Sequence, residues 1–306
     1  MATSADLGDL ILPDGRTLHF AIYGDVSAIA TIFFHHGLPG SHVETRIFDK
    51  TARRHHIRII GVDRPGMGNS TFQPDNRLLD WPANLLALAE HLQVQQFAVL
   101  GVSGGAPYVL ACLREIPRAR CVGGGIIAGV YPASLGWAGM AFETRLLFTV
   151  GAWTTWLVEK TLEYVLGAVA RDTEHPEKLE AFLEKTFDSR PEADRAVWDQ
   201  NKEQVRTILV EDSRHALRNG SRGAAWETYL VANDWGFKLE DISMEGRRLV
   251  MWHGALDANW PVGMARRAQP LLAGAELRVS ESDGHVSIFA NKVEEVMETM
   301  GEVLSD

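Results

Sequence analysis

Many hydrophobic residues of this chain lie in short, nearly continuous apolar runs. Longer segments, in which apolar and polar residues are mixed, separate these runs. Apolar runs without alternation are typical of strands that are buried on both faces of a parallel sheet. The segments between them repeat apolar residues every three to four positions, which indicates helices packed on one side. This alternation predicts an α/β fold with a mostly parallel sheet flanked by helices.

Eight segments have the composition of strands, at residues 9–13, 17–24, 30–37, 57–63, 97–102, 121–129, 247–254 and 275–282. The first two are joined at Asp14-Gly15, a dipeptide typical of a β-hairpin, so we expect them to be antiparallel. Helical spacing occurs at about 44–54, 78–92, 105–116, 261–272 and 286–304.

The alternation stops after the sixth strand. From residue 132 to residue 236 the chain shows helical patterns and polar connectors only. We therefore expect a core of residues 1–131 and 237–306, with a helical cap inserted at 132–236. Six of the nine tryptophans fall in this block, at Trp137, Trp153, Trp156, Trp198, Trp226 and Trp235.

The net charge and the distribution of apolar residues limit the kinds of partner and the cellular location that we expect. The 306 residues carry a formal net charge of −10, which argues against nucleic acid or an anionic membrane as the main partner. The first residues lack the basic region and the long apolar region that together are typical of a secretory signal. The most apolar internal stretch, 146–170, is interrupted by Glu159, Lys160 and Glu163 and is too polar for a membrane span. We expect a cytoplasmic protein that acts on a small molecule, and a homodimer is compatible with the composition.

The stretch GVSGG, residues 101–105, follows a predicted strand and precedes a predicted helix. It fits G-x-S-x-G, in which small neighbours allow a turn sharp enough to project the serine hydroxyl above the sheet. Glycine-rich turns that contain serine are common, so the pentapeptide alone leaves a structural turn open as an alternative. Its place between strand and helix favours Ser103 as a nucleophile.

A serine nucleophile needs a base and an acid that orients the base. His285 follows the last predicted strand and Asp257 follows the strand before it, where loops emerge at the carboxyl edge of a parallel sheet. The chain order Ser103, Asp257, His285 is that of an α/β hydrolase. Asp283 is an alternative acid, although its position beside His285 would aim it poorly.

The segment HHGLPGS, residues 35–41, supplies a glycine-rich loop after a buried strand. We expect the backbone N–H groups of Leu38 and Gly104 to hold the negative oxygen of a reacting carbonyl. A structural turn at Pro39-Gly40 is the alternative explanation of this loop.

Metal and cofactor motifs are missing from the sequence. There is no HExxH, no close cluster of His, Asp and Cys outside Ser103, Asp257 and His285, and no dinucleotide or phosphate fingerprint. We therefore expect no metal and no cofactor. Arg64, in the segment DRPGMGNS, is expected to brace its own loop.

The chain resembles an α/β-hydrolase through five motifs in matching order and spacing, HHGLPGS, GVDRPGMGNST, LGVSGGAPYVLA, WHGALDANWP and DGHVSIF. The resemblance covers nearly the whole chain. It implies an eight-stranded, mostly parallel sheet with a helical cap inserted after the sixth strand. It also implies that Ser103 is the nucleophile, His285 the general base and then acid, Asp257 the orienting acid, and Leu38 and Gly104 the oxyanion donors.

The expected activity is cofactor-independent hydrolysis of a carboxylic ester or lactone, and the tryptophan-rich cap favours a largely apolar substrate. Four residues are expected to contact it, His36, Trp137, Trp153 and Val286. Carbon–carbon bond hydrolysis, acyl transfer and lyase chemistry would use the same residues and stay open. A ligand receptor with weak hydrolysis is a further alternative.

The loop HGLPGS is also similar to the HGGPG loop of prolyl iminopeptidases, with leucine in place of a glycine. Those peptidases bind a substrate amino terminus with acidic residues of the cap. Glu143, Glu159 and Glu163 are the candidates for that role in this chain.

Overall fold

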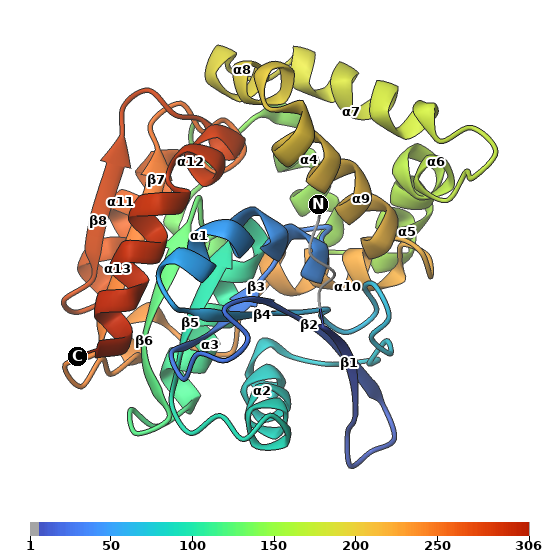
Figure 1. Cartoon of the computed structure of the whole chain (residues 1–306). Coiled ribbons are helices and arrows are strands. Elements are labelled where there is room, and N and C mark those ends of the chain that lie inside the picture. The colour runs from blue at the N-terminus through green and yellow to red at the C-terminus, as the bar shows by residue number, and fades with distance from the viewer. Residues whose placement is uncertain (1–5, 306) are drawn as a thin grey trace.

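The computed structural model describes residues 6–305, apart from the side chains of residues 202 and 203, and its centre is one eight-stranded sheet (Figure 1). The strands are β1 (Asp6–Ile11), β2 (Thr17–Gly24), β3 (Thr31–His35), β4 (Arg58–Val62), β5 (Phe97–Val102), β6 (Cys121–Ile127), β7 (Arg248–Gly254) and β8 (Glu276–Ser280). Their order is β1-β2-β4-β3-β5-β6-β7-β8. All pairs are parallel except β1 with β2 and β2 with β4. The predicted α/β fold and its eight strands are confirmed.

Helices cover both faces of the sheet. Those outside the β6–β7 connection are α1 (Asp49–Arg54), α2 (Trp81–His91), α3 (Ala106–Glu115), α11 (Val262–Ala268), α12 (His285–Asn291) and α13 (Val293–Ser305). Alternate strand residues face opposite layers. Phe33 and Val99 pack in the core with α2, α3 and α11, whereas Phe34 and Leu100 pack in the core with α1, α12 and α13. Both faces are therefore apolar, which explains the uninterrupted apolar runs in the sequence.

Seven α-helices lie between β6 and β7, and the described chain has no strand there. They are α4 (Phe142–Gly151), α5 (Thr155–Leu162), α6 (Ala168–Ala170), α7 (Glu177–Asp188), α8 (Glu192–Gln200), α9 (Thr207–Ala216) and α10 (Arg222–Ala232). We call them the inserted helices. Figure 1 shows them gathered above the end of the sheet to which the arrow of β8 points. All of them fall within the predicted insertion 132–236, whose limits as a separate cap stay a prediction.

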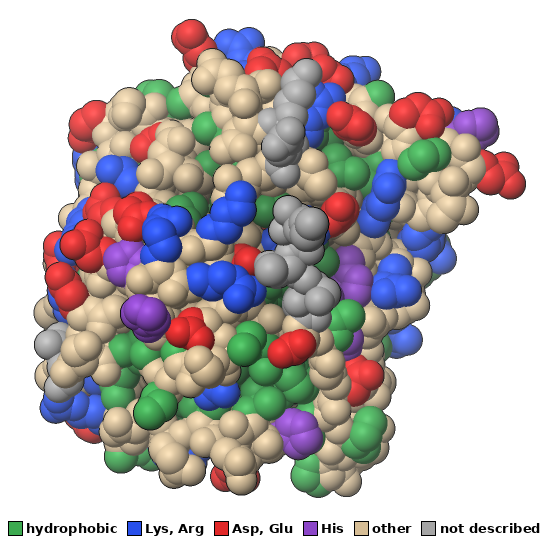
Figure 2. All heavy atoms as spheres, viewed as in Figure 1, with side chains coloured by type: hydrophobic (Ala, Val, Ile, Leu, Met, Phe, Trp, Pro, Cys, Tyr) green, Lys and Arg blue, Asp and Glu red, His purple; other side chains and the backbone are tan. Residues whose placement is uncertain are grey.

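Figure 2 shows acidic side chains beside basic ones across the face in view, so the acidic excess is not collected into one patch there. Within residues 6–305, every helix is too short or too polar to cross a lipid bilayer. Cys112 and Cys121 are buried and unpaired with each other.

Candidate active site

Ser103 lies at a sharp turn between β5 and α3. Its φ of +50° is in the left-handed region, which L-residues rarely adopt. The turn requires close backbone approach on both sides. A Cβ at Gly101 would lie 2.9 Å from the carbonyl carbon of Gly105, and one at Gly105 would lie 2.2 Å from the carbonyl oxygen of His35. The two glycines therefore permit the turn, and the turn projects Ser103 into a cavity.

Three side chains form a continuous hydrogen-bonded chain at this turn. The Ser103 hydroxyl lies 3.1 Å from Nε2 of His285, and Nδ1 of His285 lies 2.7 Å from Oδ2 of Asp257. Because a carboxylate only accepts, Nδ1 carries the proton and donates it to Asp257. Nε2 is then free to accept from the Ser103 hydroxyl. This order of contacts is the one that a serine nucleophile and its base require.

Asp257 is held rigidly in the loop after β7. Its Oδ1 accepts hydrogen bonds from the backbone N–H groups of Asn259 (2.8 Å) and Trp260 (2.9 Å), and its side chain is fully buried. Burial opposes ionisation, but the charge and hydrogen bond of His285 outweigh it, so the pKa of the Asp257 carboxyl lies below its usual range. Asp283, the alternative acid, instead accepts from Ser280 and Asn291.

The loop after β3 approaches the Ser103 turn closely. A Cβ added to Gly104 would lie 2.7 Å from Cβ of Leu38 and 3.3 Å from its backbone nitrogen. In the part of the chain that the structure describes, the Leu38 N–H donates to no acceptor. Gly104 lies at the start of the helical segment that continues into α3, where the first N–H groups have no partner within the helix. The structure thus brings together both backbone groups that were expected to bind an oxyanion.

Arg64 holds the loop after β3 in place. Its side chain was expected to brace the segment DRPGMGNS, to which Arg64 itself belongs. Its guanidinium donates to the carbonyl oxygens of His36 (2.5 Å) and Gly37 (2.8 Å) and pairs with Glu227 of α10 (Nε to Oε2, 2.8 Å). Arg64 is fully buried and its guanidinium also lies over the Tyr108 ring. A buried charge persists only when it is paired and hydrogen-bonded in this way. The loop that carries Leu38 is therefore fastened to one of the inserted helices.

The inserted helices also hold His285. Asp194 of α8 accepts from the backbone N–H groups of His285 (3.1 Å), Val286 (3.0 Å) and Ser287 (2.8 Å), at the first turn of α12. A carboxylate at a helix N-terminus satisfies N–H groups that lack partners within the helix and interacts favourably with the helix dipole. Asp194 is completely buried. It therefore fixes the position of the helix turn from which the His285 ring projects.

Replacing Asp194 with alanine is expected to destabilise the fold by about 1–2 kcal/mol, the usual effect of losing a side-chain cap. The turn that carries His285 then loosens, so kcat should fall as well. Urea unfolding and turnover of an ester substrate measure the two effects. Asp199→Ala is the matched control, because Asp199 lies on the same helix and is exposed. If both variants unfold at the same urea concentration, Asp194 does not support α12.

A cavity of about 260 Å³ opens at the Ser103 hydroxyl. Loop, turn and inserted helices contribute to its wall, which includes Leu38, Pro39, Val102, Val130, Leu147, Phe148, Leu162, Leu209, Thr228, Val231, Trp260, Val286 and Phe289. The apolar side chains among them share the wall with polar ones, which include Glu44, Thr144, Arg190, Asp212, Ser213 and Asn259, and the wall's one tryptophan, Trp260, comes from outside the inserted helices. The tryptophans of the inserted block, which were expected to line the pocket, are not among the described residues of this wall.

Of the four residues expected to contact substrate, only Val286 lines this cavity. Trp153 lies at the turn after α4 and is 87% exposed, while Trp137 is partly buried and packs against the core. His36 is fully buried, where its Nδ1 contacts the carbonyl oxygen of Gly37 and its Nε2 accepts the N–H of Arg64. The structure thus places the other three away from this cavity: His36 holds the loop, Trp137 packs against the core, and Trp153 is exposed.

Two carboxyl groups face the same cavity. Glu44 accepts the Gly37 N–H at 2.6 Å, and Asp212 of α9 accepts the N–H and hydroxyl of Ser41 at 2.8 and 2.6 Å. Burial raises the pKa of Glu44 to about 7, although the Gly37 N–H and the charge of Arg64 act in the opposite direction. Burial and the charge of Glu44 raise the pKa of Asp212 well above its usual value. The cavity thus contains an acidic pair that is costly to ionise.

The raised pKa of Glu44 predicts a loss of stability as pH rises. Between the ordinary value of 4.5 and about 7, the unfolded chain releases the Glu44 proton and the folded chain keeps it, so the free energy of unfolding falls. The fall amounts to about 3 kcal/mol at 1.36 kcal/mol per pKa unit. Glu44→Gln should remove most of it, as measured by urea unfolding at pH 5 and pH 7.5. An equal fall in wild type and variant would show that Glu44 does not titrate in this range.

Several residues of this site have no clear signal in the sequence. Asp194, Asp212 and Glu227 come from inserted helices, where acids on helix surfaces are ordinary, and the fold alone brings them to the core. Glu44 lies close to the HGLPGS loop and could have been suspected from that proximity. The expectation that no close histidine and aspartate cluster exists elsewhere is also wrong. His19, His42, Asp63 and His215 meet between β2, β4 and α9, from segments far apart in the sequence.

Comparison with known proteins agrees with this architecture. The model of the alpha/beta hydrolase fold matches residues 30–121. A proline iminopeptidase of Lactobacillus acidophilus is 35% identical over 96 residues, which cover 30% of this chain and 33% of that enzyme. The matched segment thus spans about a third of the length of such curated relatives. The match includes too little of the enzyme to transfer its activity.

Solved structures extend the likeness to the whole chain. The enol-lactonase from Burkholderia xenovorans superposes with a TM-score of 0.67 at 15% identity, over 98% of this chain and 100% of that one. An esterase from Exiguobacterium antarcticum gives a TM-score of 0.64 at 17% identity, over 97% and 99%. At such low identity the likeness shows the fold. Together with the sheet order described above and the match of residues 30–121 to the family model, it shows that this chain has the α/β-hydrolase fold.

Proposed function

We propose that this protein is a cofactor-independent serine hydrolase that cleaves a carboxylic ester or lactone. The observation that carries the proposal is the hydrogen-bonded chain from Ser103 through His285 to Asp257, with the serine on a left-handed turn at the wall of a cavity. The family and its esterase and lactonase structural neighbours support a hydrolase.

The proposed reaction begins with attack of Ser103 Oγ on the substrate carbonyl carbon, as the hydroxyl proton passes to Nε2 of His285. The carbonyl electron pair moves onto the oxygen, where the N–H groups of Leu38 and Gly104 stabilise the charge. The carbon–oxygen bond then breaks, and the leaving alkoxide takes the proton from His285. A water molecule, deprotonated by His285, hydrolyses the Ser103 ester and restores the free hydroxyl.

The dimensions of the cavity suggest a small acyl group. Its volume of about 260 Å³ lies below the roughly 300–1,000 Å³ of pockets that enclose drug-sized ligands. The aliphatic part of the wall, which includes Leu147, Leu162 and Val231, favours an apolar acyl chain, because its burial removes apolar surface from water. Short aliphatic esters and small lactones fit both conditions.

Stopped-flow hydrolysis of p-nitrophenyl esters tests the function directly. We expect a burst of p-nitrophenol equal to the enzyme concentration with the acetate, followed by steady turnover, because acyl transfer to Ser103 precedes reaction with water. The ratio kcat/KM should fall from butyrate to longer acyl chains. Small lactones are to be compared under the same conditions.

The outcomes separate the alternatives. A burst without steady turnover, and with faster release when an alcohol is added, would favour an acyltransferase. Lack of a burst and of any acyl adduct on Ser103 in intact-mass spectra, together with tight retention of a ligand, would favour a receptor. Either outcome would contradict the proposed hydrolase.

The acidic pair supports a second candidate, an aminopeptidase that acts on a small amino-terminal residue. Glu143, Glu159 and Glu163, the acids considered from the sequence, do not line the cavity, whereas Glu44 and Asp212 do. A substrate ammonium group beside them would favour their ionised form and offset its desolvation. The partial identity with proline iminopeptidases adds to this candidate.

Proline p-nitroanilide and p-nitrophenyl acetate distinguish the two candidates. For a peptidase, Asp212→Asn should raise KM for the anilide strongly and leave acetate hydrolysis nearly unchanged, because only the anilide carries the ammonium group. If the protein is an esterase, neither the wild type nor Asp212→Asn should cleave the anilide above background.

A further inference from the structure

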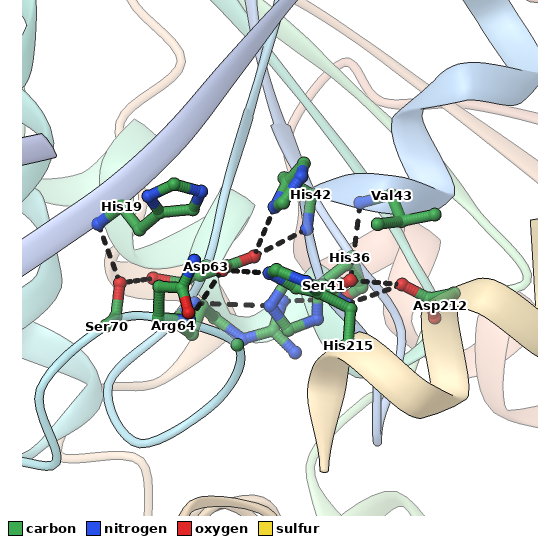
Figure 3. A network of polar contacts seen from close by, with 12 residues as sticks. His19, His36, Ser41, His42, Val43, Asp63, Arg64, Ser70, Asp212 and His215 are labelled. Atoms are coloured by element: carbon green, nitrogen blue, oxygen red, sulfur yellow. Dashed lines mark hydrogen bonds and ion pairs between the residues drawn. The ribbon is translucent and has the colours of Figure 1, made fainter. Parts of the chain in front are cut away.

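A cluster of three histidines and one aspartate lies between the core and the inserted helices. His19 comes from β2, His42 from the 3₁₀ segment η1 (His42–Phe48), Asp63 from the end of β4, and His215 from α9. Figure 3 shows the three rings close to the Asp63 carboxylate. None of the four lines the cavity at Ser103, so the proposed reaction does not use them.

His19 presents an unused nitrogen to this cluster. Its Nδ1 lies 2.6 Å from Oδ1 of Asp9, its cross-strand neighbour on β1, so Nδ1 carries the proton and donates to that carboxylate. Nε2 then holds a lone pair. The residue is only 5% exposed, and among the described residues its Nε2 has no hydrogen-bond partner. Most buried polar atoms have a partner, so this unpartnered acceptor is available to a ligand.

The other three side chains are already close to one another. His42 Nδ1 lies 3.0 Å from Oδ1 of Asp63, and His215 Nε2 lies 3.0 Å from its Oδ2. The backbone N–H groups of His42 and Asn69 hold the same carboxylate in place. One donor atom from each of the four side chains can be chosen so that all lie within 4.8 Å of one another.

The backbone of Gly68 packs tightly against the cluster. Gly68 has a φ of +54°, and a Cβ at this position would lie 1.9 Å from Oδ2 of Asp63 and 2.8 Å from Nε2 of His215. Any side chain there would collide with both groups. Glycine therefore allows the loop after β4 to pass close to the Asp63 carboxylate and the His215 ring.

We propose that His19, His42, Asp63 and His215 bind a zinc ion. Zn²⁺ prefers four nitrogen and oxygen ligands in a tetrahedron, with bond lengths of about 2.0–2.2 Å that place the ligand atoms roughly 3.3 Å apart. A small inward shift of these side chains reaches that geometry. The ion takes the place of the protons that His42 and His215 share with Asp63, and it uses the free Nε2 of His19. Asp9 then supports His19 as carboxylates support many zinc-bound histidines.

The position of the proposed zinc site, between the sheet and an inserted helix, indicates a structural role for the ion. Three ligands belong to the core and His215 belongs to α9, so the ion would fasten this helix to the sheet. The same helix carries Leu209, Asp212 and Ser213 to the cavity wall. A four-ligand site without an open position is typical of structural rather than catalytic zinc.

Zinc uptake tests the proposal independently of the reaction at Ser103. The full chain is dialysed first against a chelator and then against micromolar ZnCl₂. The bound metal is then measured by elemental mass spectrometry. We expect about one zinc ion per chain for a single four-ligand site. The Tm should rise with zinc, because the ion binds the folded chain. Bound Co²⁺ should give the intense visible bands of a four-coordinate ion.

Substitutions assign the site. Asp9→Asn keeps all four ligands and should weaken zinc binding about 10- to 100-fold, the usual effect of losing the partner of a ligand histidine. His19→Gln and His215→Gln should lose the zinc-dependent rise in Tm. His175→Gln, at an exposed histidine outside the cluster, is the matched control and should behave as wild type. Equal zinc uptake by wild type and His19→Gln, or no uptake by the wild type, would overturn the proposal.

Discussion

Ser103→Ala should lower kcat for p-nitrophenyl acetate by about 10⁶-fold, the scale found when a serine nucleophile is removed from a working triad. His285 keeps its place in this variant, because Asp257 and Asp194 hold it without help from Ser103. The remaining rate over water would come from binding and from the N–H groups of Leu38 and Gly104. Stability should change little, since alanine accepts the left-handed turn about as well as serine does.

The matched control for this variant is Ser213→Ala, which removes another serine hydroxyl from the same cavity wall. The Ser213 hydroxyl donates to the Leu209 carbonyl and contacts no base. A fluorophosphonate probe should label wild type and Ser213→Ala and leave Ser103→Ala unlabelled. Equal labelling of all three proteins would refute the nucleophile assignment, whatever their turnover.

Asp257→Asn should lower kcat by about 10⁴-fold with little change in KM. The amide keeps the acceptor for the N–H groups of Asn259 and Trp260, so the loop after β7 should keep its shape. The amide nitrogen would donate to Nδ1 of His285, which forces the ring proton onto Nε2. The ring then cannot accept the Ser103 proton, and the defect is one of tautomer rather than of position.

Asp283→Asn distinguishes the two candidate acids. Asp283 accepts from Ser280 and Asn291 and has no contact with the His285 ring, so its loss should reduce stability modestly and leave kcat within a few-fold of wild type. A 10⁴-fold loss in Asp283→Asn, with an active Asp257→Asn, would transfer the orienting role to Asp283.

The pattern of the sequence predicts the sheet because each core strand is apolar on both faces. Phe33 and Phe34 point to opposite layers and both are fully buried, so the run that contains them can only be an inner strand. The glycines beside Ser103 mark the turn, since a Cβ at Gly101 or Gly105 would collide with backbone. Asp257 and His285 follow neighbouring strands, so strand order alone brings them to one edge. These features are local in sequence and regular in geometry.

The wall of the cavity could not be predicted in the same way. A tryptophan at helical spacing can face the cavity, the core or solvent, and Trp153 and Trp198 show two of these outcomes, one exposed and one buried. Which face of an inserted helix points at Ser103 depends on how the helices cross, and single residues do not record that angle. The same holds for His215, whose partners His19 and His42 lie far away in the sequence.

The hydrogen bonds from the first turn of α12 to Asp194 limit how this protein could be re-engineered. Exchanging the inserted helices for those of a relative is an attractive route to new substrates, because much of the cavity wall comes from them. Such a chimaera would also exchange the acceptor that positions His285, the proposed base, and the pair of Glu227 with Arg64 that holds the loop of Leu38, a proposed oxyanion donor. A graft that omits either carboxylate would lose rate on every substrate. The inserted helices of this chain therefore determine both the shape of the cavity and the position of the residues proposed to react.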